Sequence, residues 1–203
     1  MHKNHYITGE KEVNKRRIIV GITGASGAIY GMSMLKALKE TGCIETHLII
    51  SNAGKDLLHM EIDREAVAKA RALAQACYEI NDLAAPVSSG TFKTEGMIIA
   101  PCSAKTLAAI AHSYGDNLIH RTADVVLKER RKLVLMFRET PLHLGHIENM
   151  AQVTKMGGII LPPVPAFYNK PETIDDIVNH AVGKVLDQFE LEHRLYKPWG
   201  TQP

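Results

Sequence analysis

Short runs of β-branched and aliphatic residues alternate with segments of helical spacing along most of this chain. This alternation constrains the fold more than any other feature of the sequence. Four clear runs and a fifth of the same style occupy residues 17–23, 45–51, 96–102, 132–138 and 158–162. Continuous apolar strands separated by helices form parallel sheets that are buried on both faces. The pattern predicts a doubly wound α/β fold, a three-layer sandwich with a central parallel sheet and ligands at the carboxyl ends of its strands.

Two helices can be placed from their apolar stripes. The first follows the first strand and carries apolar residues at helical spacing up to Gly42, which is suited to a C-terminal cap. The last helix is expected over residues 173–189, where Thr173 and Asp176 have the spacing of a capping box. Its buried stripe consists of Ile174, Ile177, Val178, Ala181, Val185 and Phe189.

Composition narrows the class of protein. A chain of 203 residues that is 45% hydrophobic and 23% charged is typical of one soluble globular domain. Its net charge of +2 provides no excess of cations for a nucleic-acid backbone, so no nucleic-acid partner is predicted. Three cysteines, Cys43, Cys77 and Cys102, cannot all pair and lack metal-ligand spacing. They indicate a reducing compartment, and we expect the cytoplasm.

The N-terminal region imitates a signal peptide but is better explained by the fold. Arg16 and Arg17 precede an apolar run of small residues, yet three glycines interrupt that run and a helical pattern follows. No segment approaches the roughly 18 continuous apolar residues of a membrane-spanning helix. Residues 1–16 are polar and without periodicity, so they are expected to form a flexible extension before a single domain over residues 17–203.

Three loops of small polar residues follow predicted strands and could bind an anion. The first, residues 24–28, has glycines that allow close backbone approach and precedes the N-terminus of a helix. The alternative is a tight turn in which Ser26 caps that helix. Residues 101–106 and the pair Ser51-Asn52 supply the other two loops, and such a set suits a mononucleotide better than a dinucleotide.

Arg138 and Glu139 follow the fourth strand, at the same predicted edge of the sheet. An arginine there is a good clamp for a phosphate or oxyanion, and a neighbouring glutamate is a plausible proton carrier. A local ion pair between the two residues is the alternative.

Four other patterns have structural explanations that we favour over functional ones. Cys102 is expected to be a buried residue rather than a nucleophile, because no His/Asp pair has an interpretable spacing. The basic end of residues 121–132 is typical of a solvated helix terminus. His143 and His146 lack a third metal ligand, and Asp175-Asp176 suits helix capping better than Mg²⁺ binding. No metal site is therefore predicted.

Near the C-terminus, Phe167 and Tyr168 place aromatic surface beyond the last strand, although core packing could also use them. Lys184 lies at the margin of the last helix's apolar stripe, where an ammonium group needs an anion or must extend to solvent. Together with Ser26 and Arg138, Tyr168 and Lys184 would form a cationic pocket that carries hydroxyl groups.

Several blocks of this sequence, in order and without large gaps from about residue 17 to 190, closely resemble the UbiX-like flavin prenyltransferases. The blocks are residues 21–28, 101–106, 123–131, 138–142, 162–168 and 185–189. The resemblance implies a flavodoxin-like, Rossmann-like subunit that assembles into a dodecamer with FMN sites at subunit contacts. It also implies transfer of a dimethylallyl group from dimethylallyl phosphate to reduced FMN, at N5 and then C6, to make prenylated FMN for a UbiD-like decarboxylase.

The resemblance also assigns site residues by their matches in this sequence. Glu61 would lie near the flavin, and Trp199 matches an aromatic residue that can close over the pocket. Lys184 stands where some members have arginine, which keeps the charge but loses a bidentate phosphate contact. FMN would be held by Gly24, Ala25, Ser26, Ser51, Cys102, Ser103, Ala104, Lys105 and Arg121. The prenyl phosphate would be held by Ser26, Lys128, Arg138, Glu139, Tyr168 and Lys184.

The assigned residues suit metal-free ionisation of an allyl ester, because that reaction needs several donors directed at the phosphate as its charge develops. Glu139 would carry protons during ring closure. Two other functions remain open. One is an FMN-dependent decarboxylase that acts directly on an aromatic or cysteinyl carboxylate, and the other is a non-catalytic subunit that delivers flavin to such a decarboxylase.

Overall fold

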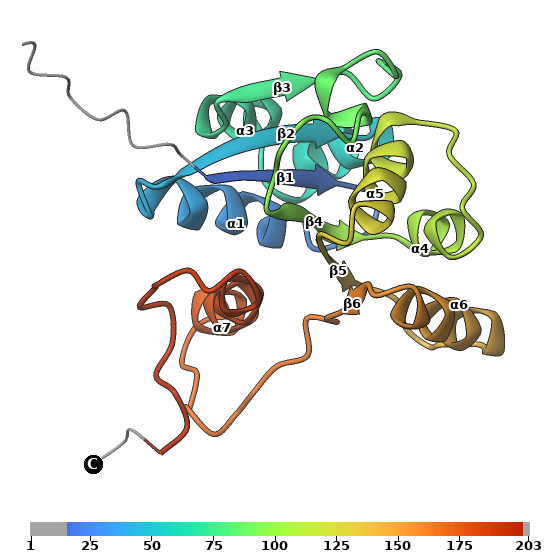
Figure 1. Ribbon diagram of the computed structural model, residues 1–203. Helices are drawn as coiled ribbons and strands as arrows, with labels where there is room; N and C mark the ends of the chain where they lie inside the picture. Colours follow the sequence, from blue (N-terminus) through green and yellow to red (C-terminus); the bar gives the residue numbers. More distant parts are fainter. Residues whose placement is uncertain (1–15, 201–203) are drawn as a thin grey trace, which may run out of the picture.

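The computed structural model describes residues 16–200, and these fold around one parallel β-sheet (Figure 1). The six strands are arranged in the order β3-β2-β1-β4-β5-β6, and every neighbouring pair is parallel. Their bounds are β1 Arg16–Ile22, β2 Ile44–Ile50, β3 Ala76–Tyr78, β4 Gly96–Cys102, β5 Lys132–Phe137 and β6 Ile159–Ile160. The predicted central parallel sheet is confirmed.

Alternate residues of the strands face two separate cores, which is the reason that the strands read as continuous apolar runs. Ile18, Val20 and Ile22 of β1 contribute to one core, whereas Ile19 contributes to the other. Helices α1 (Ala28–Glu40), α2 (Asn52–Glu61), α3 (Ala66–Leu73) and α7 (Ile174–Gln188) cover the first face. Helices α4 (Ala104–Ala111), α5 (Leu118–Lys128) and α6 (Leu144–Lys155) cover the second. The three-layer sandwich is therefore confirmed.

The strand order places a switch point between β1 and β4. The chain runs outward from β1 through β2 to β3, then crosses to β4 and continues outward to β6 (Figure 1). Without the three-residue edge strand β3, the order is that of flavodoxin-like folds. Connections that leave β1 and β4 toward opposite faces open a crevice at the carboxyl ends of these strands.

Local signals account for the ends of the helices. The capping box of α7 is present as predicted, because the Thr173 hydroxyl accepts from the Asp176 N–H while the Asp176 carboxylate accepts from the Thr173 N–H. Gly42 follows α1 with a φ of 68°, a left-handed conformation that glycine adopts without strain. No helix within residues 16–200 is long and apolar enough to cross a membrane.

The expected strands are found within one or two residues of their bounds, and one further strand is present. Strand β1 begins at Arg16, one residue earlier than expected. The Arg16 guanidinium donates to the carbonyl oxygen of Phe189 at 3.0 Å. The short strand β3 was not expected, because the three residues Ala76–Tyr78 are too few to give a recognisable pattern. The rest of the expected N-terminal extension, residues 1–15, lies outside the described residues.

Candidate active site

A pocket of about 620 Å³ lies at the carboxyl ends of β1, β2 and β4, next to the switch point. The register of the sheet brings its loops together, since Ile22 pairs with Ile50 and the Ser51 N–H donates to the carbonyl oxygen of Ile22 at 3.0 Å. The walls of the pocket consist of Thr23, Gly24, Ala25, Ser26, Ser51, Asn52, Ala53, Ile80, Asn81, Ser103, Ala104, Lys105, Thr106, Asp116, Asn117, His120, Arg138 and Glu139. The three small-polar loops predicted from the sequence thus meet at one site.

Thr23 fastens the first loop to the third. Its hydroxyl donates to the carbonyl oxygen of Pro101 at 2.7 Å and accepts from the N–H of Ser103 at 2.9 Å. Because Thr23 is buried, these two bonds hold the ends of β1 and β4 in a fixed relation.

Glycines in the first loop allow close packing that a side chain would prevent. A Cβ added at Gly24 would lie 2.5 Å from the Cβ of Ala53 at the start of α2. Gly27 has a φ of 107°, which L-residues with side chains rarely adopt. These constraints leave the backbone of the loop exposed to the pocket.

The first loop already binds an anionic group. The Glu61 carboxylate accepts from the N–H groups of Gly27 and Ala28 at 2.8 and 2.7 Å, at the N-terminus of α1. Partial burial acts to raise the pKa of Glu61, but hydrogen bonds from Ser26 and these two backbone groups outweigh it and hold the pKa below its ordinary value. Ser26 does not cap α1, since Gly27 is the N-cap residue. The Glu61 carboxylate therefore occupies the anion-binding N–H groups at this helix end.

The other two loops open α2 and α4 with serine caps. The Ser51 hydroxyl accepts from the N–H of Gly54 at 3.0 Å, and the Ser103 hydroxyl accepts from the N–H of Thr106 at 3.3 Å. Lys105 extends from the first turn of α4 with 76% of its side chain exposed. Three helix N-termini and an ammonium group thus surround one pocket, an arrangement that attracts phosphate groups.

Helix α5 contributes a wall that the sequence interpretation missed. Asn117 caps α5, and the imidazole of the buried His120 contacts the Asp116 carboxylate at 2.8 Å. Burial lowers the pKa of His120 more than Asp116 raises it, so the imidazole is neutral at physiological pH. The Asp-Asn pair before a helical segment is a cap signal that could have marked this helix start.

Arg138 and Glu139 follow β5 and complete the wall of the pocket, as predicted. They do not form the ion pair considered from the sequence, because the Glu139 carboxylate accepts instead from the N–H of Thr140 at 3.1 Å. The positive charge of Arg138 acts on Glu61 and helps to lower its pKa.

Similar proteins identify the family of this chain. The family model described as Flavoprotein matches residues 7–186. Flavin prenyltransferase UbiX of Thauera aromatica is 54% identical over 183 residues, which cover 90% of this chain and 93% of that protein. The corresponding enzyme of Escherichia coli K12 is 52% identical over 186 residues, or 91% and 98% of the two chains. This chain belongs to the UbiX-like flavin prenyltransferase family.

Solved structures of UbiX-like proteins have the same subunit fold. AnUbiX (PadA1), solved in complex with FMN and dimethylallyl pyrophosphate, matches with a TM-score of 0.90 and 47% identity over 94% of this chain and all of that one. A dodecameric FMN-dependent UbiX-like decarboxylase from Escherichia coli O157:H7 matches with a TM-score of 0.88 and 51% identity over 90% and 98% of the two chains.

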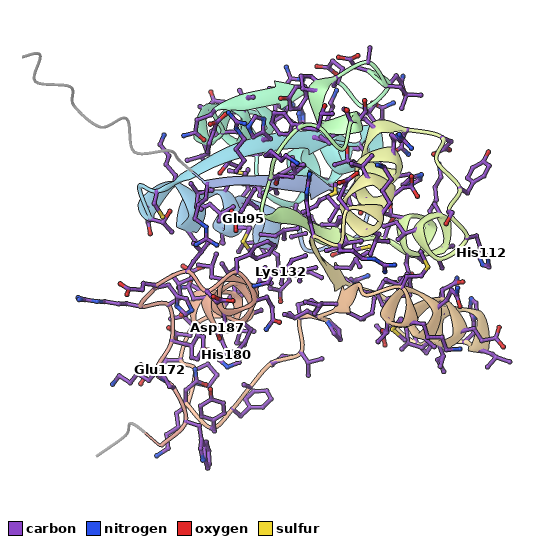
Figure 2. All side chains as sticks on the ribbon, viewed as in Figure 1. Glu95, His112, Lys132, Glu172, His180 and Asp187 are labelled. Carbon is purple, nitrogen blue, oxygen red and sulfur yellow. The ribbon has the colours of Figure 1, made fainter. Side chains whose placement is uncertain are left out.

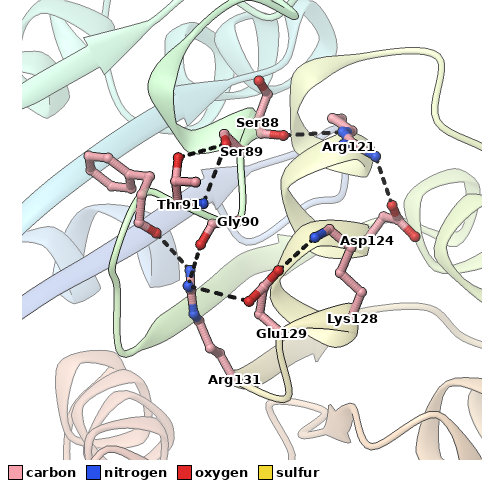
Figure 3. Close-up of polar contacts among 10 residues, drawn as sticks. Ser88, Ser89, Gly90, Thr91, Arg121, Asp124, Lys128, Glu129 and Arg131 are labelled. Atoms are coloured by element: carbon pink, nitrogen blue, oxygen red, sulfur yellow. Dashed lines mark hydrogen bonds and ion pairs between the residues drawn. The ribbon is translucent and has the colours of Figure 1, made fainter.

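Two residues that the UbiX-like pattern assigns to the site, Arg121 and Lys128, lie outside the pocket of this chain. They line a separate hollow of about 560 Å³ beside the loop of residues 88–91 (Figure 3). Arg121 donates to the carbonyl oxygen of Ser88 at 3.2 Å, and Lys128 contacts the Glu129 carboxylate at 2.6 Å. Both side chains remain about half exposed.

Tyr168 and Lys184 also lie outside the pocket of the single chain. The Tyr168 hydroxyl hydrogen-bonds to Nε2 of His180 at 3.2 Å, and the ring of Trp199 packs edge-on against Tyr168. Lys184 pairs with the Asp187 carboxylate at 3.0 Å and also keeps 46% of its side chain exposed, so both alternatives considered for it apply. A single chain therefore brings together Ser26, Arg138, Glu139 and Glu61, but not Tyr168, Lys184 and Lys128.

The remaining candidates have structural roles here. Cys102 is fully buried, and burial raises the pKa of its thiol far above the ordinary value, which opposes nucleophilic chemistry. The His143 imidazole caps α6 by accepting from the N–H of Gly145, and its ring packs 3.7 Å from that of His146. Within the described part of the chain, no group of His, Cys, Asp or Glu side chains has the arrangement of a metal site.

Proposed function

We propose that this chain transfers the dimethylallyl group of dimethylallyl phosphate to reduced FMN, at N5 and then at C6, to give prenylated FMN. The observation that carries the proposal is the convergence of three strand-end loops on one pocket, with Ser26 and Arg138 in its wall. AnUbiX supports both substrates, because it was solved with FMN and the pyrophosphate ester of the same allyl group.

The pocket fits a phosphorylated flavin. Gly24, Ala25 and Ser26 of the first loop line the pocket, and the serine-capped N-termini of α2 and α4 open beside them. Thr106 lines the pocket and is added to the residues predicted to bind FMN. Cys102, which is buried, would support the third loop from within the core. FMN would be held by Gly24, Ala25, Ser26, Ser51, Ser103, Ala104, Lys105 and Thr106, and by Arg121 from a neighbouring copy.

The prenyl phosphate needs donors from more than one copy of the chain. A monophosphate is a poor leaving group, so several cations and hydroxyls must stabilise the charge that develops as the allyl–oxygen bond breaks. Ser26 and Arg138 are in place in the pocket. We assign Lys128, Tyr168 and Lys184 to the same phosphate across subunit contacts, in a dodecamer like that of the Escherichia coli O157:H7 relative.

Two carboxylates are placed to manage protons and charge. When bound, the reduced flavin supplies the nucleophilic ring atoms of the reaction. Glu139 in the pocket wall and the departing phosphate would both serve as acceptors for the proton released during ring closure. Glu61, which hydrogen-bonds to the first loop, would keep that loop fixed beside the flavin.

The proposal is tested by mixing the purified protein with reduced FMN and dimethylallyl phosphate under anaerobic conditions. Mass spectrometry should detect a flavin heavier by one dimethylallyl group, and recovery of unmodified FMN alone would reject the transferase. Arg138→Met and Glu139→Gln should each lower the rate by at least about 100-fold, as expected when charge stabilisation or proton transfer is removed.

A direct decarboxylase is the second candidate, because two similar solved proteins carry that description, from Escherichia coli O157:H7 and Aquifex aeolicus. This function predicts release of CO₂ from an aromatic carboxylic acid by the isolated chain with FMN. A transferase releases none unless a decarboxylase is added.

We also propose that the product serves a UbiD-like decarboxylase in the cytoplasm. The three cysteines are all free, in keeping with a reducing compartment. A mere delivery subunit would activate the decarboxylase equally well after Glu139→Gln or Lys184→Ala, whereas a transferase would lose that activation with either change.

A further inference from the structure

The Asp187 carboxylate lies at the centre of a polar cluster that joins α7 to the C-terminal segment. Its Oδ2 accepts from Lys184 Nζ at 3.0 Å and from the Tyr196 hydroxyl, and its Oδ1 contacts His193 Nε2 at 3.0 Å. We call Lys184, Asp187, His193 and Tyr196 the Asp187 cluster. Figure 2 shows Asp187 on α7, with His180 on the same helix. Both oxygens of the carboxylate are engaged, so its position is fixed from two sides.

The geometry leaves Lys184 able to bind a further anion. An ammonium group has three donors. One donates to Asp187, and a second approaches the Tyr196 oxygen at 3.5 Å, while 46% of the side chain remains exposed. Within residues 16–200, Asp187 is the only carboxylate that pairs with Lys184. The third donor thus belongs to a half-exposed side chain that the Asp187 cluster holds in place.

The C-terminal segment packs against α7 where the helix has no side chain. A Cβ added at Gly183 would lie 2.6 Å from Tyr196 Cδ1 and 2.8 Å from His193 Cε1. These contacts place the two aromatic rings directly on the helix backbone. The docking of residues 193–196 therefore determines where Tyr196 and His193 meet Asp187.

The same cluster connects to Tyr168 through His180. The rings of His180 and Tyr196 lie 4.7 Å apart, and His180 Nε2 hydrogen-bonds to the Tyr168 hydroxyl at 3.2 Å. If His180 donates from Nε2, the Tyr168 oxygen accepts and its own O–H remains available to a phosphate. Two residues assigned to the prenyl phosphate thus share one supporting network.

We propose that Asp187 is a positioning residue, which with Tyr196 and His193 holds the Lys184 ammonium in the orientation that binds the phosphate of the prenyl donor. This inference rests on the proposed function, in which Lys184 contacts that phosphate. Lysine lacks the pre-organised planar fork of arginine, so it gains more from being held by a fixed carboxylate. Asp187 would act through Lys184 and would not touch the substrate.

The test is the anaerobic assay with Asp187→Asn, which removes the charge but keeps the shape. The KM for dimethylallyl phosphate should rise roughly tenfold, as expected from the loss of one charge-assisted contact. The Kd for FMN should stay within about twofold of the wild-type value, since Asp187 is not in the wall of the FMN pocket. Asp187→Glu keeps the charge and should recover part of the loss. Calorimetry should show the same weakening for dimethylallyl phosphate binding to the FMN-loaded protein.

Two further variants separate positioning from general damage. Gly183→Ala displaces the C-terminal segment without removing a polar group, and it should raise the same KM. Asp175→Asn removes an exposed carboxylate from the first turn of the same helix and should leave the KM unchanged.

The direction in which Asp187→Asn changes the KM for dimethylallyl phosphate decides the proposal. A lower KM in Asp187→Asn would overturn it, because Asp187 would then compete with the phosphate for Lys184. An unchanged KM would also overturn it. If the wild-type protein makes no prenylated flavin, the proposed function fails instead, so the two failures are distinguishable.

Discussion

At the scale of single residues, Glu61 makes the clearest prediction. Its carboxylate caps α1 through the N–H groups of Gly27 and Ala28. Because its pKa is lowered in the folded chain, its stabilisation is present above the ordinary pKa of glutamate and is lost as the pH falls through the lowered value. Glu61→Gln should therefore reduce the free energy of unfolding by about 1 kcal/mol near pH 7, as typical caps do.

Urea unfolding of both proteins from pH 7 down to about pH 3 measures this difference, which should shrink as Glu61 becomes protonated. Glu148→Gln, at an exposed position of α6, is the control and should change stability by less than about 0.5 kcal/mol. A loss that does not change with pH would mean that the carboxylate acts through packing rather than through its charge.

The residues of the pocket were predictable where they follow strands. Parallel strands end at one edge of a sheet, so Ser26, Ser51, Ser103 and Arg138 had to lie near one another once the strands were recognised. His120 could not be found in this way, since the approach of α5 to that edge depends on tertiary packing.

At the scale of elements, α1 packs so closely on the sheet that only glycine fits at one position. A Cβ at Gly31 would lie 2.6 Å from the carbonyl oxygen of Ala100 and 3.0 Å from Ile22 Cδ1. Helix propensity alone would make Gly31→Ala stabilising by about 1 kcal/mol. The clash with backbone should reverse the sign and lower the free energy of unfolding by about 1–2 kcal/mol.

The control for Gly31 is Lys36→Ala, at an exposed position of the same helix that does not approach the sheet. Chemical denaturation should place this control within about 0.5 kcal/mol of the wild type. A loss of similar size at both positions would show that the contact with β4 does not control stability here.

The elements found from the sequence are those with a clear pattern of apolar residues. Strands buried on both faces, and α7 with its capping box, were located within one or two residues. The edge strand β3 was missed because Ala76–Tyr78 is held by pairing with β2 and not by its own pattern. Strand β6 is only two residues long, although the apolar run around it is longer.

At the scale of the whole molecule, the single chain leaves apolar side chains exposed around the residues that its pocket lacks. Val164 and Phe167 are 68% and 71% exposed, and they adjoin Tyr168 in a segment that extends away from the sheet (Figure 1). Apolar side chains that gather in one segment mark interaction surfaces. We therefore expect this segment to contact another copy and to carry Tyr168 toward a neighbouring pocket.

Phe167→Asp should break that contact, because burying a carboxylate among apolar groups is costly. Light scattering should find a particle smaller than the wild-type assembly of 22.4-kDa chains. Loss of the assembly should lower the rate of flavin prenylation at least about 100-fold. Tyr168 and Lys184 would then no longer meet the pocket that holds Ser26 and Arg138. Lys36→Asp places the same carboxylate at an exposed polar position of α1 and should preserve both assembly and activity. Full activity in a monomeric Phe167→Asp protein would show that one chain completes the site alone.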